Sequence, residues 1–306
     1  MIVDYGSFAG RLRSVMPRWD ERPFMAEADF AAHLADTGPR WELLRRFQDE
    51  WGYVPSGPPS WRREDESEHE LYVRKLRGEL LDEDEEEDLE GVDVSLPIPR
   101  AVDEWWDLPF NSFTRDARLY WTNPVWPPTV RPDPSGYGVS EAFPPESGFA
   151  DPDGDLRVCV LMAEYQYCNE WGYAAADAAL ADPRVYVSDG GARWWRQAGS
   201  VTEFYLALAA VRLPAALRPS VEVGTLPPDA LARLRAGFPE LGFEPWRELG
   251  RHAVLHGGPD VILQHDAGDG DAELIAAGRT REALLAAGRA LGLDWTADIT
   301  DPSPRD

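Results

Sequence analysis

The sequence predicts an α+β protein in which a central mixed or antiparallel sheet is packed with helices. Three observations predict this class: short apolar runs of strand length, longer segments with apolar residues at helical spacing, and clusters of Gly, Pro and Asp between them. The chain has 306 residues, of which 43% are hydrophobic, with 13 Trp, 10 Tyr and 11 Phe. This composition supports a packed core and excludes a chain that is disordered as a whole.

Residues 1–79 are expected to form an N-terminal helical region. Apolar residues recur there at helical spacing in three patches that prolines separate: Phe8, Leu12 and Val15; Phe30 and Leu34; and Trp41, Leu44, Phe47 and Trp51. A further charged helix is predicted over residues 62–88. Its acidic end, residues 82–88, is either a solvated face or an electrostatic attraction for a basic partner.

The middle of the chain predicts strands followed by a helix. Residues 158–162 form a continuous apolar run, typical of a strand covered on both faces, and polar and aromatic residues end the run. A second strand is predicted at 185–187. Ser200, with Glu203 three residues later, predicts a capping box that opens a helix ending near Pro214.

The order and spacing of these segments resemble the core signature of the SUKH superfamily. In that family a strand ends in a Glu-Asn-Gln-Gly-like segment, followed by Trp-Gly, then Asp-Pro-Pro-Val, then a Ser-x-x-Glu-Phe helix. The matching residues are Glu164, Gln166, Trp171, Gly172, Asp182, Pro183, Val185, Ser200, Glu203 and Phe204. Tyr165 and Tyr167 stand where the family has small polar residues. No Gly follows Gln166, and Arg184 replaces the second proline.

Residues 89–106 resemble the entry helix of the same family, in which Leu-Pro precedes an aromatic-rich helix. The resemblance covers about residues 80–210 of this sequence. It implies a SUKH-like core domain at 80–215, with a central sheet flanked by helices.

A small C-terminal αβ unit is predicted at residues 224–297, after a linker at 213–223. Its predicted elements are a helix at 229–234, strands at 253–255, 261–263 and 273–276, and a helix that Thr280 caps and that ends at Leu291 before Gly292. Trp295 is expected to pack its indole on this unit, and residues 298–306 are expected to be a disordered tail.

The charge balance bears on the kind of partner. The net charge is −25, with 55 acidic and 30 basic residues, so the surface repels nucleic-acid phosphates and anionic membranes and favours a cationic partner. No stretch approaches 18 apolar residues, and the N-terminus lacks the pattern of a signal peptide, so we expect a cytoplasmic protein. Two cysteines, Cys159 and Cys168, make no disulfide framework.

Two acidic or histidine-rich patterns invite a metal interpretation. In residues 151–155 the glycine is fourth rather than sixth, and Met162 stands where a calcium loop needs Glu, so an Asx-rich turn is favoured. His252, His256 and His265 have no thiol or further ligand at zinc spacing. The sequence therefore predicts no metal and no cofactor.

The sequence signals for a catalytic site are weak as well. There is no Gly-x-Ser-x-Gly, no Walker loop and no Gly-x-Gly-x-x-Gly after a strand. With 55 carboxylates in the chain, chance acid–base pairs are plentiful. We therefore expect a protein that is not an enzyme, with a hydrolase that uses Glu164, or a thiol enzyme that uses Cys168, as the alternative class.

The candidate partner-binding residues follow from position. Glu164 and Gln166 end the predicted buried strand, where polar side chains can meet a partner. Trp171 either packs over the sheet or contacts the partner. Trp106 and Trp195 each belong to a Trp-Trp pair, of which one member can enter the core while the other faces a groove.

SUKH superfamily members include bacterial immunity proteins and fungal regulators of cell-wall assembly. The resemblance implies a non-enzymatic immunity-type protein that neutralises a bacterial toxin by protein–protein contact. The acidic surface favours a basic, nuclease-like toxin as that partner. The alternative is a cytoplasmic regulatory or scaffold module of the same fold with a cellular partner.

Overall fold

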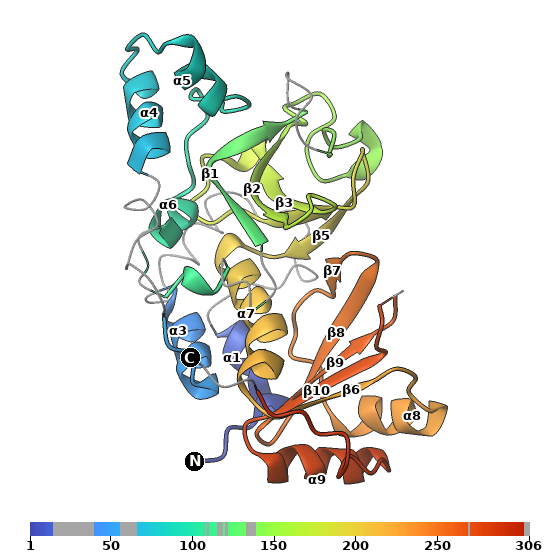
Figure 1. The fold of residues 1–306 in the computed structure, drawn as a ribbon. Helices are drawn as coiled ribbons and strands as arrows, with labels where there is room; N and C mark the ends of the chain where they lie inside the picture. The colour runs from blue at the N-terminus through green and yellow to red at the C-terminus, as the bar shows by residue number, and fades with distance from the viewer. Residues whose placement is uncertain are drawn as a thin grey trace. The chain divides into compact units, whose positions relative to one another are not determined.

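The computed structural model describes residues 1–14, 40–55, 66–106, 108, 110–114, 119, 122–132, 139–268 and 270–302. In this part of the chain, eight α-helices and two antiparallel five-stranded sheets make an α+β fold, as predicted (Figure 1). The chain divides into two compact units with one sheet each. We call residues 55 and 66–202 the first-sheet unit, and residues 1–14, 40–54 and 203–302 the second-sheet unit.

The first-sheet unit contains a meander in which neighbouring strands along the chain are neighbours in the sheet. Its strands are β1 (Thr122–Arg131), β2 (Val158–Glu164), β3 (Glu170–Ala174), β4 (Val185–Ser188) and β5 (Trp194–Ala198). The strands predicted at 158–162 and 185–187 are confirmed as β2 and β4. Every residue of β2 is buried, as its continuous apolar run indicates.

Strands β3 and β5 were not among the predicted strands. In β3 a glycine interrupts the apolar pattern, and it is needed because the two backbones approach closely. A Cβ on Gly172 would lie 2.5 Å from the Cys159 carbonyl oxygen of β2. The β2–β3 ladder shifts register between Val160 and Met162 at this point.

The described residues of the first-sheet unit also form three α-helices: α4 (Glu66–Leu76), α5 (Glu83–Asp88) and α6 (Arg100–Trp106). The single charged helix predicted over 62–88 is wrong, because the chain turns between α4 and α5. Gly78 has a φ of +71°, and Asp82 begins a new helix with a capping box to Glu85. The aromatic-rich helix expected before residue 106 is confirmed as α6.

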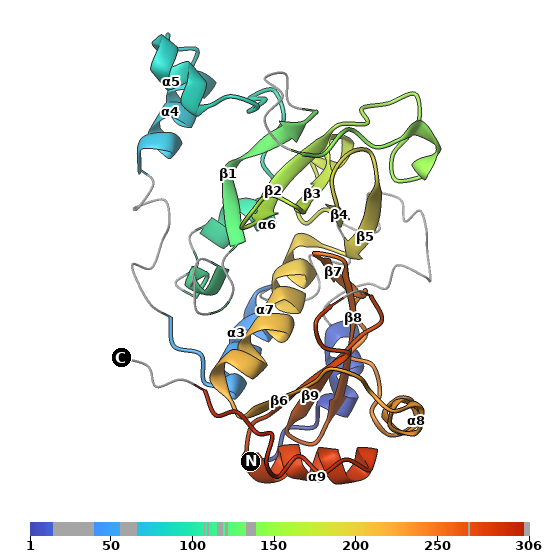
Figure 2. The same ribbon diagram turned by 45° about the vertical axis from the view of Figure 1, so that its right-hand side comes forward.

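The second-sheet unit has the strand order β6-β10-β9-β8-β7. These strands are β6 (Ser220–Val223), β7 (Trp246–Glu248), β8 (Arg251–Gly258), β9 (Val261–Asp266) and β10 (Leu274–Gly278). Helices α8 (Pro228–Gly237) and α9 (Arg281–Leu291) pack on one face in a shared hydrophobic cluster. On the other face lies α7 (Val201–Leu217), whose Val211 carbonyl accepts a hydrogen bond from Gln264 Nε2 at 2.6 Å (Figure 2).

Several predictions for the C-terminal segment are confirmed. Strands β9 and β10 pair as an antiparallel hairpin. The Thr280 side chain accepts a hydrogen bond from the Ala283 N–H at 3.2 Å, and Gly292 ends α9 with a φ of +76°. Trp295 is buried in the cluster of α8 and α9.

Two other predictions for this segment are wrong. The linker expected at 213–223 is occupied by the last turn of α7 and by strand β6, which pairs with β10. The tail expected to be disordered from residue 298 forms an antiparallel bridge, because the Thr300 N–H donates to the Ser220 carbonyl at 2.9 Å and the Ser220 N–H donates back. Residues 303–306 lie outside the described residues.

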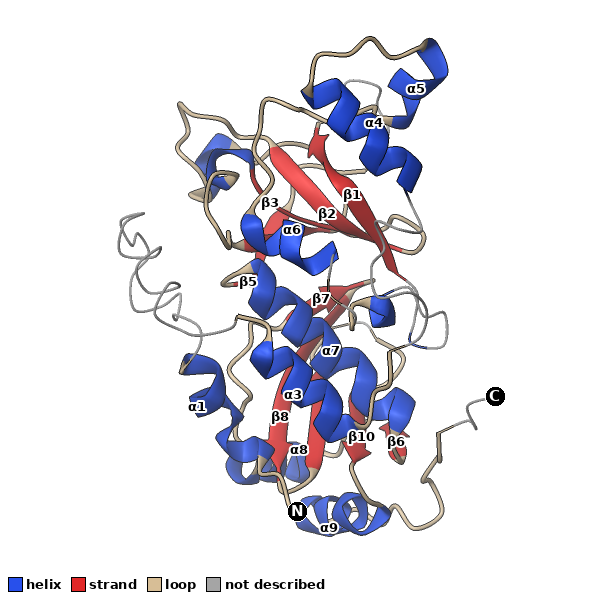
Figure 3. Cartoon of the chain, turned by 90° about the vertical axis from the view of Figure 1, so that its left-hand side faces the viewer, coloured by secondary structure: helices blue, strands red, loops and turns tan. Residues whose placement is uncertain are grey.

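Helices α1 (Phe8–Arg13) and α3 (Glu42–Trp51) confirm two of the three helical patches predicted near the N-terminus. The patch at Phe30 and Leu34 lies outside the described residues, as does Val15. Figure 3 shows α3 and α7 side by side, and the rings of Trp41 and Tyr205 lie 6.2 Å apart between them. These helices group with the second sheet, so the predicted boundaries near residues 79 and 215 do not coincide with the two units.

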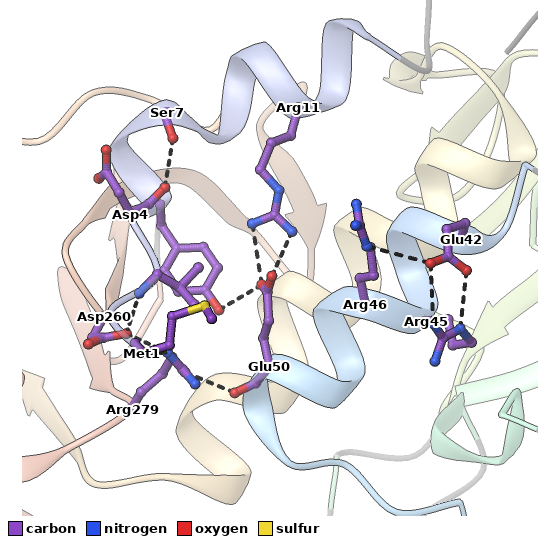
Figure 4. Close-up of polar contacts among 12 residues, drawn as sticks. Met1, Asp4, Ser7, Arg11, Glu42, Arg45, Arg46, Glu50, Asp260 and Arg279 are labelled. Carbon is purple, nitrogen blue, oxygen red and sulfur yellow. Dashed lines mark hydrogen bonds and ion pairs between the residues drawn. The ribbon is translucent and has the colours of Figure 1, made fainter. Parts of the chain in front are cut away.

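A polar network ties the N-terminal segment to α3 and to the second sheet (Figure 4). The Glu50 carboxylate accepts hydrogen bonds from the Tyr5 hydroxyl at 3.1 Å and from Arg11 Nη2 at 2.8 Å. Arg279 donates to the Glu50 carbonyl at 2.9 Å and pairs with the Asp260 carboxylate. The network explains why residues 1–14 belong to the same compact unit as the C-terminal strands.

Candidate functional site

Among the described residues of the first-sheet unit, the β2–β3 turn carries the most exposed aromatic side chains. Residues 165–168, which we call the tyrosine turn, are all exposed. Tyr165 is 46% exposed and Tyr167 is 41% exposed. Large aromatic side chains at a loop tip are typical of recognition surfaces, because they offer rigid apolar area with a polar end.

The Glu164 carboxylate holds this turn from below. Its side chain is 0% exposed, and Oε2 accepts hydrogen bonds from the Gln166 N–H at 2.9 Å and the Cys168 N–H at 3.2 Å. The Glu164 backbone closes the same turn, because its N–H donates to the Asn169 carbonyl and its carbonyl accepts from the Tyr167 N–H, both at 2.8 Å. Donors within the turn therefore compensate the burial of this carboxylate.

Two asparagine side chains fix the tip and the base of the turn. Asn123 Nδ2 of β1 donates to the Tyr165 carbonyl at 3.1 Å. Asn169 Nδ2 donates to the Ser188 carbonyl at the end of β4 at 3.0 Å. Tyr167 has a φ of +61°, a left-handed backbone that a bulky residue rarely adopts. The turn is thus held by hydrogen bonds from both sides in an uncommon conformation.

The sequence-predicted site residues fall into two groups. Gln166 is exposed on the tyrosine turn, as expected. Glu164 is buried, so the expectation that its side chain meets a partner is wrong; it bonds its own turn instead. Trp171 is buried over the sheet, which corresponds to the packing role rather than to partner contact. The sequence did not single out Tyr165 and Tyr167 as contact residues, although both appeared as departures from the family pattern.

The tryptophan pairs behave differently from each other. Trp194 is buried and donates from Nε1 to the Glu141 carbonyl at 2.9 Å, while Trp195 is partly exposed with the Arg193 guanidinium 5.6 Å from its ring centre. This pair follows the expected division between core and surface. Trp106 does not, because it is 1% exposed.

The burial of Trp106 has a structural reason. Its ring lies 5.3 Å from that of Trp126 of β1, and the neighbouring Trp105 packs edge-on against Phe113 at 5.9 Å. Both members of this pair are therefore core residues, and the prediction that Trp106 faces a groove is wrong.

Asp182, another residue of the SUKH-like signature, also accepts a hydrogen bond from the backbone. Asp182 is buried, and its carboxylate accepts hydrogen bonds from the Thr202 N–H at 3.0 Å and the Thr202 hydroxyl at 2.7 Å. These contacts satisfy a free N–H in the first turn of α7. Glu164 and Asp182 are thus both carboxylates that organise local backbone.

The patterns considered for metal binding have structural explanations. In the Asp151 turn, the Asp153 N–H donates to the Asp151 carboxylate at 3.1 Å, which makes the predicted Asx turn. His256 Nδ1 lies 2.9 Å from the Phe238 carbonyl oxygen. Within the described ranges, no group of three or more His, Cys, Asp or Glu side chains is placed to hold a metal ion.

The two thiols differ in environment. Cys168 is exposed on the tyrosine turn, whereas Cys159 is buried in β2. Burial raises the pKa of the Cys159 thiol to about 12, which opposes formation of the reactive thiolate.

The negative charge is concentrated in the part of the sequence that contains the tyrosine turn. Residues 55–202 hold 30 of the 55 acidic residues but only 13 of the 30 basic residues. Helix α5 alone presents four exposed acidic side chains: Glu83, Asp84, Glu86 and Glu87. A charge excess of this size attracts cations over distances beyond direct contact at low ionic strength.

Comparisons of this chain with protein-family models, with curated proteins and with solved structures found no match. The SUKH resemblance therefore remains a prediction from the sequence. Among the helices in the described ranges, none has the length and apolar character needed to cross a bilayer.

Proposed function

We propose that this chain is a non-enzymatic, cytoplasmic binding protein of the immunity type, which neutralises a cationic, nuclease-like bacterial toxin by protein–protein contact. The observation that carries the proposal is the exposure of Tyr165 and Tyr167 on one hydrogen-bonded turn. The SUKH resemblance implies that the partner is a toxin, and the net negative charge of this chain favours a positively charged partner.

Tyrosine suits this role for two reasons. Its side chain has few rotatable bonds, so ordering it in a complex costs little conformational entropy compared with a long aliphatic or charged side chain. Its ring also attracts Arg and Lys side chains through cation–π contacts. Tyr165 and Tyr167 therefore fit a partner surface that presents basic groups around an apolar centre.

The acidic surface increases the association rate of the complex more than its affinity. Opposite net charges steer two proteins toward each other and raise the association rate, and salt suppresses this effect. With 30 acidic and 13 basic residues between positions 55 and 202, the region of the tyrosine turn has the sign required for a basic toxin domain. Rapid capture is what an immunity protein needs, because the toxin is harmful while it is free.

The test is to express toxin-like domains encoded beside this chain's gene and measure their binding by biolayer interferometry. We expect a complex whose association rate falls steeply between about 50 and 500 mM salt. Replacing both tyrosines, Y165A/Y167A, is expected to raise the Kd at least about tenfold. Leu249→Ala is the matched control, because Leu249 is an exposed apolar side chain of the other unit.

Two results would count against the proposal. One is the absence of a salt-sensitive complex with any cationic toxin domain encoded nearby. The other is a complex whose Kd is the same for the wild type and for Y165A/Y167A. A tight complex with a cellular protein that is no toxin would favour the regulatory or scaffold alternative instead.

A further inference from the structure

We infer that Glu164 is the positioning residue of the tyrosine turn: its buried carboxylate fixes the backbone that presents Tyr165 and Tyr167, without touching the partner. The role of this turn in recognition rests on the proposed function, but the hydrogen bonds that hold the turn are independent of any partner. Glu164, a residue of the SUKH-like signature, thus has a role other than the direct contact with a partner that the sequence predicted.

Two backbone N–H groups of the turn donate to the Glu164 carboxylate. A single oxygen, Oε2 of Glu164, accepts hydrogen bonds from the N–H groups of Gln166 and Cys168, which flank Tyr167 on both sides. Two donors converging on one acceptor restrict the torsion angles of the residue between them. The carboxylate therefore determines the conformation of Tyr167 from inside the protein.

The backbone conformation of Tyr167 is uncommon for an aromatic residue. Its φ of +61° is a conformation that glycine and asparagine adopt more readily than an aromatic residue. Such a conformation persists only where surrounding contacts impose it. A tyrosine at this position is poorly explained by the stability of the turn, whereas its exposed ring is explained by recognition.

Backbone hydrogen bonds, not side-chain contacts of the carboxylate, pair β2 with β3. The Glu164 backbone pairs with Asn169, whose side chain bonds the Ser188 carbonyl. Removing the carboxylate oxygens should therefore loosen residues 165–168 and leave β2 and β3 paired. This separation makes the role of the side chain testable in the folded protein.

The experiment compares Glu164→Met with Glu164→Gln. Methionine keeps the approximate length of the buried side chain but removes the acceptor, while glutamine keeps one acceptor oxygen and removes the charge. Glu87→Gln is the control for lost charge, because Glu87 is exposed on α5 of the same unit. Amide hydrogen exchange at Gln166 and Cys168, measured by NMR, reports the turn without any ligand.

We expect E164M to accelerate exchange at Gln166 and Cys168 by about tenfold or more, with Val160 of β2 unchanged. E164Q should restore most of the protection, and E87Q should have no effect. Unchanged exchange at Gln166 and Cys168 in E164M would overturn the inference, as would an equal acceleration at Val160. The second result would mean that the substitution disrupts the strand rather than the turn alone.

A binding cycle separates this inference from the proposed function. With a nona-arginine peptide as the cationic probe, E164M should weaken binding in the wild type and change nothing further in Y165A/Y167A. If E164M weakens binding equally in both backgrounds, the carboxylate acts outside the tyrosines and the inference fails. If Y165A/Y167A alone leaves the affinity unchanged while E164M loosens the turn, the proposed contact surface fails and the positioning of the turn stands.

Discussion

Arg131 and Glu170 form a buried ion pair in the first-sheet unit, with Arg131 Nη2 2.7 Å from Glu170 Oε1 and side chains 6% and 0% exposed. Arg131 Nε also donates to the same carboxylate at 3.0 Å, and the Ser140 N–H donates to Oε2 at 3.1 Å. Charges this deeply buried are stable only with several partners, and this pair has them. The pair links the end of β1 to the start of β3.

Breaking the pair on one side is expected to be costly. Glu170→Gln leaves the buried guanidinium without its counter-charge, so we expect a loss of about 3–5 kcal/mol in the free energy of unfolding. Urea denaturation followed by tryptophan fluorescence measures the change. Glu104→Gln is the control, because Glu104 pairs with the exposed Arg100 and should change stability by at most about 1 kcal/mol. Equal effects of the two substitutions would contradict the importance assigned to the buried pair.

Gly172 is expected to tolerate no side chain. A Cβ there would lie 2.5 Å from the Cys159 carbonyl oxygen and 2.8 Å from Val158 Cγ1, both in the adjacent strand β2. Gly172→Ala should therefore force the two strands apart and cost about 1–3 kcal/mol. Thermal unfolding measures the effect. Gly224→Ala is the matched control, because nothing lies within 4 Å of a Cβ at that position; a similar loss there would show that the close approach is not the cause.

Local signals made the ends of α9 predictable. Thr280 accepts a hydrogen bond within its own helix, and Gly292 adopts the left-handed conformation that favours glycine. Both effects depend on residues a few positions apart. Strand β6 could not be found in the same way, since it has four residues and pairs with β10, which is distant in the sequence. Strand β7 has three residues, too few to show an apolar alternation.

The candidate site was predictable in position but not in detail. The end of an apolar run indicated that polar residues from Glu164 onward leave the sheet. The inward orientation of the carboxylate and the left-handed backbone of Tyr167 occur together, because the N–H groups on both sides of Tyr167 bond one carboxylate oxygen. No sequence pattern predicts that conformation for a tyrosine. The burial of Trp106 likewise depends on Trp126, 20 positions away and in another element.

Leu249 is expected to be a suboptimal turn residue. Leu249 and Gly250 join β7 to β8 in a two-residue loop with φ values of +49° and +78°. Asparagine is far better suited than leucine to the first of these positions. Leu249→Asn should therefore raise the free energy of unfolding by about 1 kcal/mol. Leu249→Ala keeps the strained backbone and serves as the comparison in the same chemical denaturation experiment; a stability of L249N no higher than that of L249A would refute the explanation.

His265 is expected to make the stability of the second-sheet unit depend on pH. Burial lowers the pKa of its imidazole, the neighbouring His256 and Arg235 lower it further, and Glu273 and Asp266 act in the opposite direction. The unfolded chain therefore binds a proton at a higher pH than the folded chain does. Stability is fully present above the unfolded value of about 6.5 and is lost as the pH falls from there through the lower folded pKa.

The measurement is the free energy of unfolding in urea between pH 8 and pH 5. We expect a decline below about pH 6.5 in the wild type. His265→Gln should have a shallower decline, because the substituted side chain does not titrate in this range. Some dependence should remain in H265Q, since burial also lowers the pKa of His252. A pH profile of H265Q parallel to that of the wild type would show that protonation of His265 does not oppose folding.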